Sequence, residues 1–280
     1  MQALSFEVNG RASYGLMVDG GIREARDDFR LRYPTLRSVL AGGALSKLPQ
    51  NVADDVLSVD GFRYLPLIPN PDKVICVGVN YREHVEEMGR ELPTQPTLFV
   101  RFAGSIVGHD EPLIRTRVSD QLDFEGELAI VIGCRARHVP RQEAYDCIAG
   151  YACFMDGTVR DWQRHTTQFT PGKNFHRSGA LGPWLLTADD LPNPESLSLT
   201  TRVNGNVMQE GKVEDLIFDI PALIEYCSTF TELLPGDIIS TGTPAGVGAA
   251  RTPPIWLREG DRVEVDIGPV GCLQNTVCDE

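Results

Sequence analysis

The sequence lacks long apolar runs, an excess of basic residues and paired cysteine motifs. No apolar run approaches the roughly 18–20 residues that span a bilayer, and the first residues show no signal peptide, so we expect a cytoplasmic protein without a membrane partner. The formal net charge of −13 disfavours nucleic acid as a partner. The seven cysteines have no paired spacing, which indicates reduced thiols, as in a cytosolic protein.

Composition and turn signals predict a folded chain with a small first domain. The 280 residues are 42% hydrophobic and 23% charged, without repeats or low-complexity tracts, which is typical of a globular protein. Residues 1–65 are predicted to form a small β-rich domain, with a hairpin turning at Asp19-Gly20-Gly21 and a short helix capped by Thr35. Prolines at 66, 69 and 71 mark a linker, so residues 66–280 are expected to form the larger domain.

The stretch from Asp123 to Gly133 carries acids into a buried strand. Its second half is a continuous apolar run, typical of a strand buried on both faces. Side chains two apart in a strand share a face, so Asp123, Glu125 and Glu127 would crowd together. Burying unpaired carboxylates is costly, and a divalent metal with oxygen ligands would compensate them. The alternative is an exposed strand end with solvated acids.

A third acid, Asp156, follows the apolar strand predicted at 148–155. An acid at the end of a buried strand is where a further ligand could meet the acids of the first strand. The alternative for an Asp followed by Gly157 is a turn or a helix cap.

His84 and Glu87 lie three residues apart after a short apolar strand at 74–79. In a helical turn they would share one face, and a carboxylate that orients a histidine is a common general-base pair. The alternative is an incidental contact on an exposed helix. Pro93 and Pro96 end this segment, which makes residues 82–96 a candidate lid.

Two loops carry further candidates. Lys173 lies in a loop rich in glycine and proline. The glycine-rich loop at 242–248 would let backbone N–H groups approach an anion, but it lacks the lysine and the spacing of a nucleotide-binding P-loop.

The remaining elements are predicted from periodicity and turn residues. They comprise a helix opening at 138–144, a hairpin of 197–203 and 206–210, a helix at 219–230, and strands at 238–241, 262–267 and 271–277.

Five motifs occur in an order that resembles the fumarylacetoacetate hydrolase family, especially its acylpyruvase-like branch. The resemblance runs from about residue 73 to the last residue. Singly each motif is weak, and together they are specific. They are Gly78-x-Asn80-Tyr81-x-x-His84-x-x-Glu87, Asp123-x-Glu125-x-Glu127, Asp156-x-x-x-Arg160-Asp161-x-Gln163, Gly172-Lys173 and Gly242-Thr243-Pro244-x-Gly246-Val247-Gly248.

The resemblance implies a fold, a metal and a site. The fold would be α+β and β-rich, a mixed β-roll or sandwich with flanking helices, in a catalytic domain at 66–280 that forms a homodimer. One Mg²⁺ or Mn²⁺ would be held by Glu125, Glu127 and Asp156. His84 and Glu87 resemble the family's water-activating dyad, and Lys173 resembles its lysine beside the substrate oxygens. The residues that match its substrate pocket are Tyr81, Arg160, Gln163, Gly242 and Thr243.

The resemblance also predicts a reaction on a small molecule. We expect a hydrolase that cleaves a carbon–carbon bond of an acylpyruvate-type 1,3-diketo acid to a 2-oxo acid and a carboxylic acid, as in aromatic catabolism. The alternative is decarboxylation of an oxaloacetate-like acid, or keto–enol isomerisation of a ring-cleavage product. A metal-stabilised binding protein would not need both His84 and Glu87. Departures from the family pattern at Arg101, Met155 and Val159 leave the acyl side of the substrate open.

Overall fold

Three β-sheets form the scaffold. The computed structural model describes residues 1–280, with the side chain of Val59 outside the description. The large sheet has the strand order β3 (Gly21–Glu24), β2 (Arg11–Val18), β1 (Gln2–Val8), β13 (Gly179–Thr187), β11 (Ile148–Met155), β10 (Gly126–Ile132), β16 (Ile238–Ser240), β5 (Val74–Gly78) and β6 (Thr97–Val100), with β4 (Arg63–Tyr64) beside β1 and β7 (Ile106–Val107) beside β13. The second sheet has the order β15 (Asn206–Lys212), β14 (Ser198–Val203), β17 (Arg262–Asp266), β18 (Cys272–Asp279) and β8 (Leu113–Arg115). The third pairs β12 (Thr158–Val159) with β9 (Leu122–Asp123).

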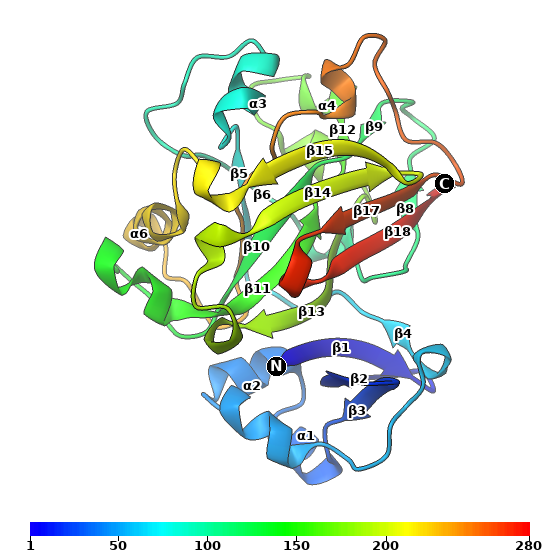
Figure 1. Ribbon diagram of the computed structural model, residues 1–280, viewed down its shortest axis with the longest axis vertical. Helices are drawn as coiled ribbons and strands as arrows, with labels where there is room; N and C mark the ends of the chain where they lie inside the picture. Colours follow the sequence, from blue (N-terminus) through cyan, green and yellow to red (C-terminus); the bar gives the residue numbers. More distant parts are fainter.

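Short helices surround these sheets (Figure 1). The α-helices are α1 (Asp27–Arg32), α2 (Leu36–Ala41), α3 (Arg82–Glu87), α4 (Arg160–Gln163), α5 (Thr170–Lys173) and α6 (Ile220–Phe230). The 3-10 helices are η1 (Leu45–Asn51), η2 (Val59–Gly61), η3 (Ala103–Ser105), η4 (Arg141–Cys147), η5 (Ala188–Asp190), η6 (Pro194–Ser196), η7 (Val213–Asp215), η8 (Gly248–Ala250) and η9 (Gly268–Val270). Among the described residues, no helix has both the length and the apolar character that crossing a membrane requires.

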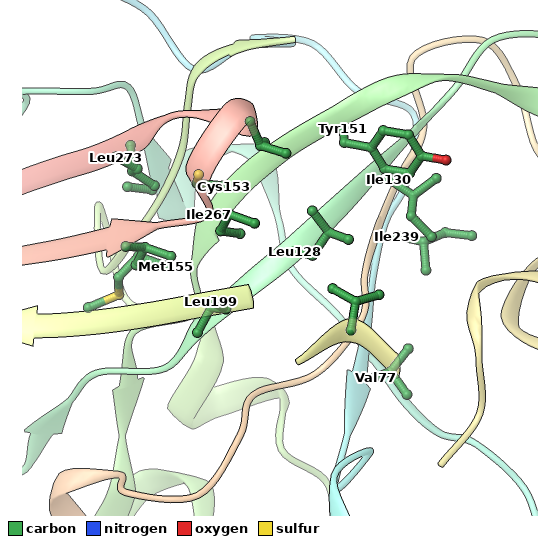
Figure 2. Close-up of a cluster of buried hydrophobic side chains, with 14 of the residues drawn as sticks. Val77, Leu128, Ile130, Tyr151, Cys153, Met155, Leu199, Ile239, Ile267 and Leu273 are labelled. Atoms are coloured by element: carbon green, nitrogen blue, oxygen red, sulfur yellow. The ribbon is translucent and has the colours of Figure 1, made fainter. Parts of the chain in front are cut away.

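Strands β10 and β11 lie at the centre because both of their faces are buried. Alternate residues point to opposite sides of a strand. Leu128 and Ile130 of β10 pack in the core that includes Leu199 of β14 and Leu273 of β18, as Figure 2 shows. Their neighbour Ala129 faces a second core, which the first two helices help to form. Burial on both sides explains the continuous apolar run in the sequence. It also fixes the position of β10, which carries Glu127 near its start.

The first 65 residues form strands and helices, and β1 joins them to the large sheet. The hairpin of β2 and β3 and the helix α2 are confirmed, and Thr35 caps α2 by accepting a hydrogen bond from the backbone N–H of Ser38. Strand β1 pairs with β13, with Gln2 opposite Leu186. The large sheet is therefore continuous across this junction, at the lower end of Figure 1. A domain boundary at residue 65 stays a prediction.

Three local predictions are wrong. The acidic stretch is not one strand, because β9 ends at Asp123 and β10 begins at Gly126. The helix expected from residue 138 is the 3-10 helix η4, which begins at Arg141. Lys173 ends the one-turn helix α5 rather than lying in an open loop. The hairpin of β14 and β15 and the helix α6 are confirmed.

Candidate functional site

A cluster of three buried carboxylates lies where β10 and β11 meet. Glu127 lies near the start of β10, Glu125 just before it, and Asp156 follows the last residue of β11. The antiparallel pairing places Gly126 opposite Met155, and the Asp156 N–H donates to the Glu125 carbonyl over 2.8 Å. One carboxylate oxygen from each acid lies within 4.8 Å of the others. The predicted convergence of Glu125, Glu127 and Asp156 is therefore present.

Three buried cations contact this cluster. Lys173 donates to Asp156 over 2.6 Å and also to Glu125, while Arg160 donates to Glu125 over 2.6 Å. Arg101 binds the other oxygen of Asp156 and also donates to the Gly157 carbonyl. Arg101, which departs from the family pattern, is therefore a second cation beside Asp156.

The helices α4 and α5 bring Lys173 to the cluster by packing closely. A Cβ atom on Gly172 would lie 2.4 Å from the backbone nitrogen of Gln163, so a larger residue would separate the two helices. Lys173 is 2% exposed, and its ammonium lies 4.8 Å from the centre of the Phe99 ring. Burial opposes the charge of Lys173, but the carboxylates of Asp156 and Glu125 outweigh it and raise the pKa of its ammonium. Lys173 is therefore a fixed positive charge at neutral pH.

The two glutamates of the cluster titrate in opposite directions. Burial opposes ionisation of Glu125, but the charges of Arg160 and Lys173 outweigh it and lower the pKa of its carboxyl group. Burial, together with the charges of Asp156 and Glu125, raises the pKa of Glu127 well above its usual value. Glu127 accepts hydrogen bonds from the Ser240 hydroxyl and from a backbone N–H, and no described cation forms an ion pair with it. A positive charge is missing at Glu127.

This imbalance tests whether a metal fits. Together with Asp123, the cluster holds four carboxylates against the three cations Arg101, Arg160 and Lys173. If all ionise, one negative charge is uncompensated, and it is buried. Carboxylate oxygens are the ligands that hard divalent cations prefer. The acidic triad could thus bind a divalent metal ion.

Asp123 has a different position from the other acids of its motif. Because the strand is interrupted after Asp123, its side chain turns toward Arg160 and η8. It accepts hydrogen bonds from the Arg160 Nε over 2.8 Å, from the Gly248 N–H over 2.8 Å and from the Ala249 N–H over 3.0 Å. Asp123 orients Arg160, and Arg160 in turn contacts Glu125.

The glycine-rich loop does approach anions, and these anions are carboxylates of the protein itself. Its backbone N–H groups donate to Glu127 from Gly242, to Glu87 from Gly246 and to Asp123 from Gly248, over 3.0, 2.9 and 2.8 Å. A single loop therefore fixes three acids from three separate segments.

The predicted histidine–carboxylate pair forms on α3. The His84 Nδ1 lies 2.7 Å from the Glu87 Oε1, and His84 is 4% exposed. Tyr81 is the N-cap residue of α3 and is buried. It lies beside Gly211.

A small inner cavity unites most of the candidate residues. Its volume is about 30 Å³, and it is lined by Glu125, Glu127, His84, Lys173, Arg160, Gln163 and Thr243. Gly78 of the first motif also lines it, together with residues that the sequence did not single out: Val77, Val79, Met88, Arg90, Phe99 and Phe169. Gly242 contributes its N–H to Glu127, and the Thr243 hydroxyl donates to the Gly126 carbonyl over 2.9 Å. No short-range pattern marks Arg90 or Phe169, since they meet only through the fold.

An adjoining cavity of about 400 Å³ continues toward solvent. It shares Met88, Arg90, Gln163 and Phe169 with the inner cavity, and it adds Arg164 and the threonines 97, 166 and 167. The Arg90 guanidinium lies over the Phe169 ring, 5.3 Å from its centre. Two arginines and no acid line this outer cavity as described, which is notable in a chain with a net charge of −13.

The comparison with protein families decides which family the chain belongs to. The family model described as fumarylacetoacetate (FAA) hydrolase C-terminal matches residues 73–278. The chain belongs to the fumarylacetoacetate hydrolase family. The family resemblance of the motifs and the β-rich α+β fold class are thereby confirmed.

Three relatives show what members of this family do. The oxaloacetate tautomerase YisK of Bacillus subtilis is 43% identical over 215 residues, 75% of this chain and 71% of that protein. The 5-carboxymethyl-2-hydroxymuconate delta-isomerase from Mycobacterium smegmatis is 32% identical with a TM-score of 0.81 over 100% of both chains. Maleylpyruvate hydrolase from Sphingobium sp. SYK-6, solved with manganese(II) ion and pyruvate, is 26% identical with a TM-score of 0.81 over 100% of this chain and 99% of that chain.

These findings support an enzyme of the family and change the order of the predicted reactions. The relatives include a tautomerase and an isomerase as well as a hydrolase. Carbon–carbon hydrolysis, which we placed first, is not confirmed. The alternative, decarboxylation of an oxaloacetate-like acid or keto–enol isomerisation of a ring-cleavage product, is better supported by the comparisons.

Proposed function

We propose that this protein is a metal-dependent tautomerase that moves a proton between C3 and the 2-oxygen of a 2-oxo acid. The observation that carries this proposal is that His84 and two acids of the triad, Glu125 and Glu127, line one inner cavity. Hydrolysis needs an attacking water beside the substrate, whereas tautomerisation needs only a base and a short proton transfer.

Glu125, Glu127 and Asp156 would hold the metal, and we propose Mg²⁺ or Mn²⁺ because all three ligands are carboxylates. The ion would supply the positive charge that is missing at Glu127 and would attract the oxygens of an anionic 2-oxo acid. The manganese in the maleylpyruvate hydrolase structure supports this choice.

His84 is the proposed base. Lys173 is engaged with the triad, since its ammonium donates to Asp156 and to Glu125. Glu87 accepts from the Nδ1–H of His84, which leaves Nε2 free to take the C3 proton and return it to the 2-oxygen. Lys173 and Arg160 then act as fixed charges beside the substrate.

The outer cavity supports a substrate with a second carboxylate. Arg90 and Arg164 line it, and it adjoins the inner cavity at Gln163. A 2-oxo acid with its reacting end at the triad would extend its tail toward these arginines. Charge-assisted hydrogen bonds from guanidinium to carboxylate are strong and directional. A 2-oxo diacid therefore fits better than a monoacid.

The test uses NMR in D₂O to monitor the exchange of the C3 protons of a 2-oxo diacid. The protein is loaded with Mg²⁺ and contains no Mn²⁺. We expect exchange with the wild type, and a fall in kcat of about 10²–10⁴ in His84→Ala because a general base is lost. Glu86→Ala, on the exposed side of the same helix, is the matched control. Equal exchange rates in His84→Ala and in the wild type would contradict the role of His84, and no exchange above the metal ion alone would contradict the proposed function.

Hydrolysis of an acylpyruvate is the second candidate. It is favoured by the His84–Glu87 pair, which could activate a water if the lid opens the cavity, and by the similarity to maleylpyruvate hydrolase. Assays for pyruvate release and for decarboxylation of oxaloacetate on the same preparation would rank the three reactions.

A homodimer also stays a proposal, and sedimentation equilibrium would test it.

A further inference from the structure

Arg251 lies at the end of a chain of hydrogen bonds that leads to His84. Its Nη2 donates to the Met208 carbonyl over 2.6 Å, and its Nε donates to the Gly246 carbonyl over 3.2 Å. The Gly246 N–H donates to the Glu87 Oε2 over 2.9 Å, and the Glu87 Oε1 contacts His84. Arg251 is half-buried and is not among the described residues that line the inner cavity.

Gly246 needs an external support at this position. Its φ of 102° is a conformation that residues with side chains rarely adopt, and a Cβ atom would lie 2.2 Å from the Met208 carbonyl oxygen. Only glycine fits, and glycine is also the residue with the most conformational freedom. The two hydrogen bonds from Arg251 hold Gly246 against Met208, and so they restrict the direction of the Gly246 N–H.

The Gly246 N–H is what fixes Glu87 from outside its helix. Helix α3 has only six residues and ends at Glu87, and Gly89 just after it has a φ of 62°. So short a helix has little stability of its own. The bond from Gly246 to Glu87 joins this lid segment to the loop that also fixes Glu127 and Asp123.

We propose that Arg251 is a positioning residue that latches the lid: it holds Gly246, Gly246 holds Glu87, and Glu87 orients His84 over the acidic triad. The predicted effect of Arg251 on the rate of C3 proton exchange rests on the proposed function. The latch itself is a statement about the lid, and it can be measured without turnover.

The test is a double-mutant cycle of Arg251→Met and Glu87→Ala, with two measurements. The first is kcat and KM for C3 proton exchange. Arg251→Met is expected to lower kcat about tenfold and to change KM by less than about threefold, since a positioning residue acts on the reacting geometry. In the Glu87→Ala protein, Arg251→Met should lower kcat by less than a further factor of about two, because the effects of residues that act through one another are not additive.

The second measurement is hydrogen exchange of the amides of residues 82–90 by mass spectrometry. We expect faster exchange in Arg251→Met and in Glu87→Ala, with no further increase in the double mutant. Arg251→Lys keeps the charge and can still donate one hydrogen bond, so it should restore part of the protection. Arg258→Met, an exposed arginine seven positions later, is the matched control and should leave both measurements unchanged.

The outcomes separate the two proposals. If the wild type exchanges no C3 protons, the proposed function fails, and the lid amides alone decide whether the latch exists. If Arg251→Met leaves the lid amides protected, or if its effect on kcat is fully retained in the Glu87→Ala protein, the latch is overturned.

Discussion

Replacing Glu127 with glutamine should raise stability without a metal ion and reduce the stabilisation that a metal ion gives. Glutamine has the shape of a protonated glutamate, and the raised pKa of Glu127 means that the metal-free protein favours that protonated form. The amide oxygen can still accept the hydrogen bonds from Ser240 and from the Gly242 N–H. Without metal, Glu127→Gln should therefore be at least as stable as the wild type.

The distances within the triad give the size of the effect. At 4.8 Å two carboxylates repel by about 3 kcal/mol with an effective dielectric constant of ~20. The neighbouring cations offset part of this repulsion, so we expect Glu127→Gln to stabilise the metal-free protein by about 1–3 kcal/mol. That corresponds to a rise in Tm of about 2–6 °C.

The pH dependence has a sign that follows from the same shift. A group whose pKa is raised in the folded state contributes stability below its unfolded pKa, and this contribution is lost as pH rises through the folded pKa. The metal-free wild type should thus lose stability as pH rises above the ordinary glutamate value of 4.5. Glu127→Gln should lack this component of the pH dependence.

With metal the wild type should gain more stability than the mutant. A metal at about 100 times its Kd stabilises the wild type by about 2.7 kcal/mol, or roughly 5 °C. If the neutral amide weakens binding about 100-fold, the gain in the mutant falls to about 0.4 kcal/mol.

The assay is thermal unfolding by calorimetry in chelator and in a titration of Mg²⁺ or Mn²⁺, across pH, with the exposed Glu86→Gln as the control. An equal metal-induced rise in Tm in the wild type and in Glu127→Gln would refute the assignment of Glu127 as a ligand. A mutant several kcal/mol less stable than the wild type in chelator would refute the reasoning about its charge.

Three further predictions concern other parts of the molecule. Asp123→Asn should lower the free energy of unfolding by about 3 kcal/mol, because it breaks a buried ion pair. In a calorimetric titration it should lower metal affinity by less than about tenfold. A far larger loss of metal affinity would make Asp123 a ligand. Burial lowers the pKa of His109, so stability measured by urea denaturation should decline as pH falls below about 6.5. If the slope of stability against pH is unchanged in His109→Gln, this histidine is excluded as the cause. Arg90→Gln should raise KM about tenfold for a 2-oxo diacid and leave the KM for a monoacid of equal length unchanged. The control is Arg32→Gln in α1, a helix at the other end of the molecule from α3 (Figure 1). An equal effect on both acids would exclude a contact to the distal carboxylate.

Short-range patterns predicted most of the elements near the site. The spacing of His84 and Glu87 requires only one helical turn, and α3 supplies it. The apolar runs of β10 and β11 are local signals of burial on both faces, and both strands were predicted. The position of Asp123 was not predictable in this way, because strand spacing says nothing of where a strand is interrupted.

By itself the sequence determined the family, the fold class and the acids and bases available to the site, because these are set by residue identity, local spacing and the order of motifs. Only the tertiary structure decided which partner each charge has. Asp123 faces Arg160, Arg101 supports Asp156, and the glycine-rich loop donates to carboxylates of this chain rather than to a phosphate. The members of each pair lie far apart in the sequence. Their pairing depends on distances that sheet packing creates, and no local pattern encodes those distances.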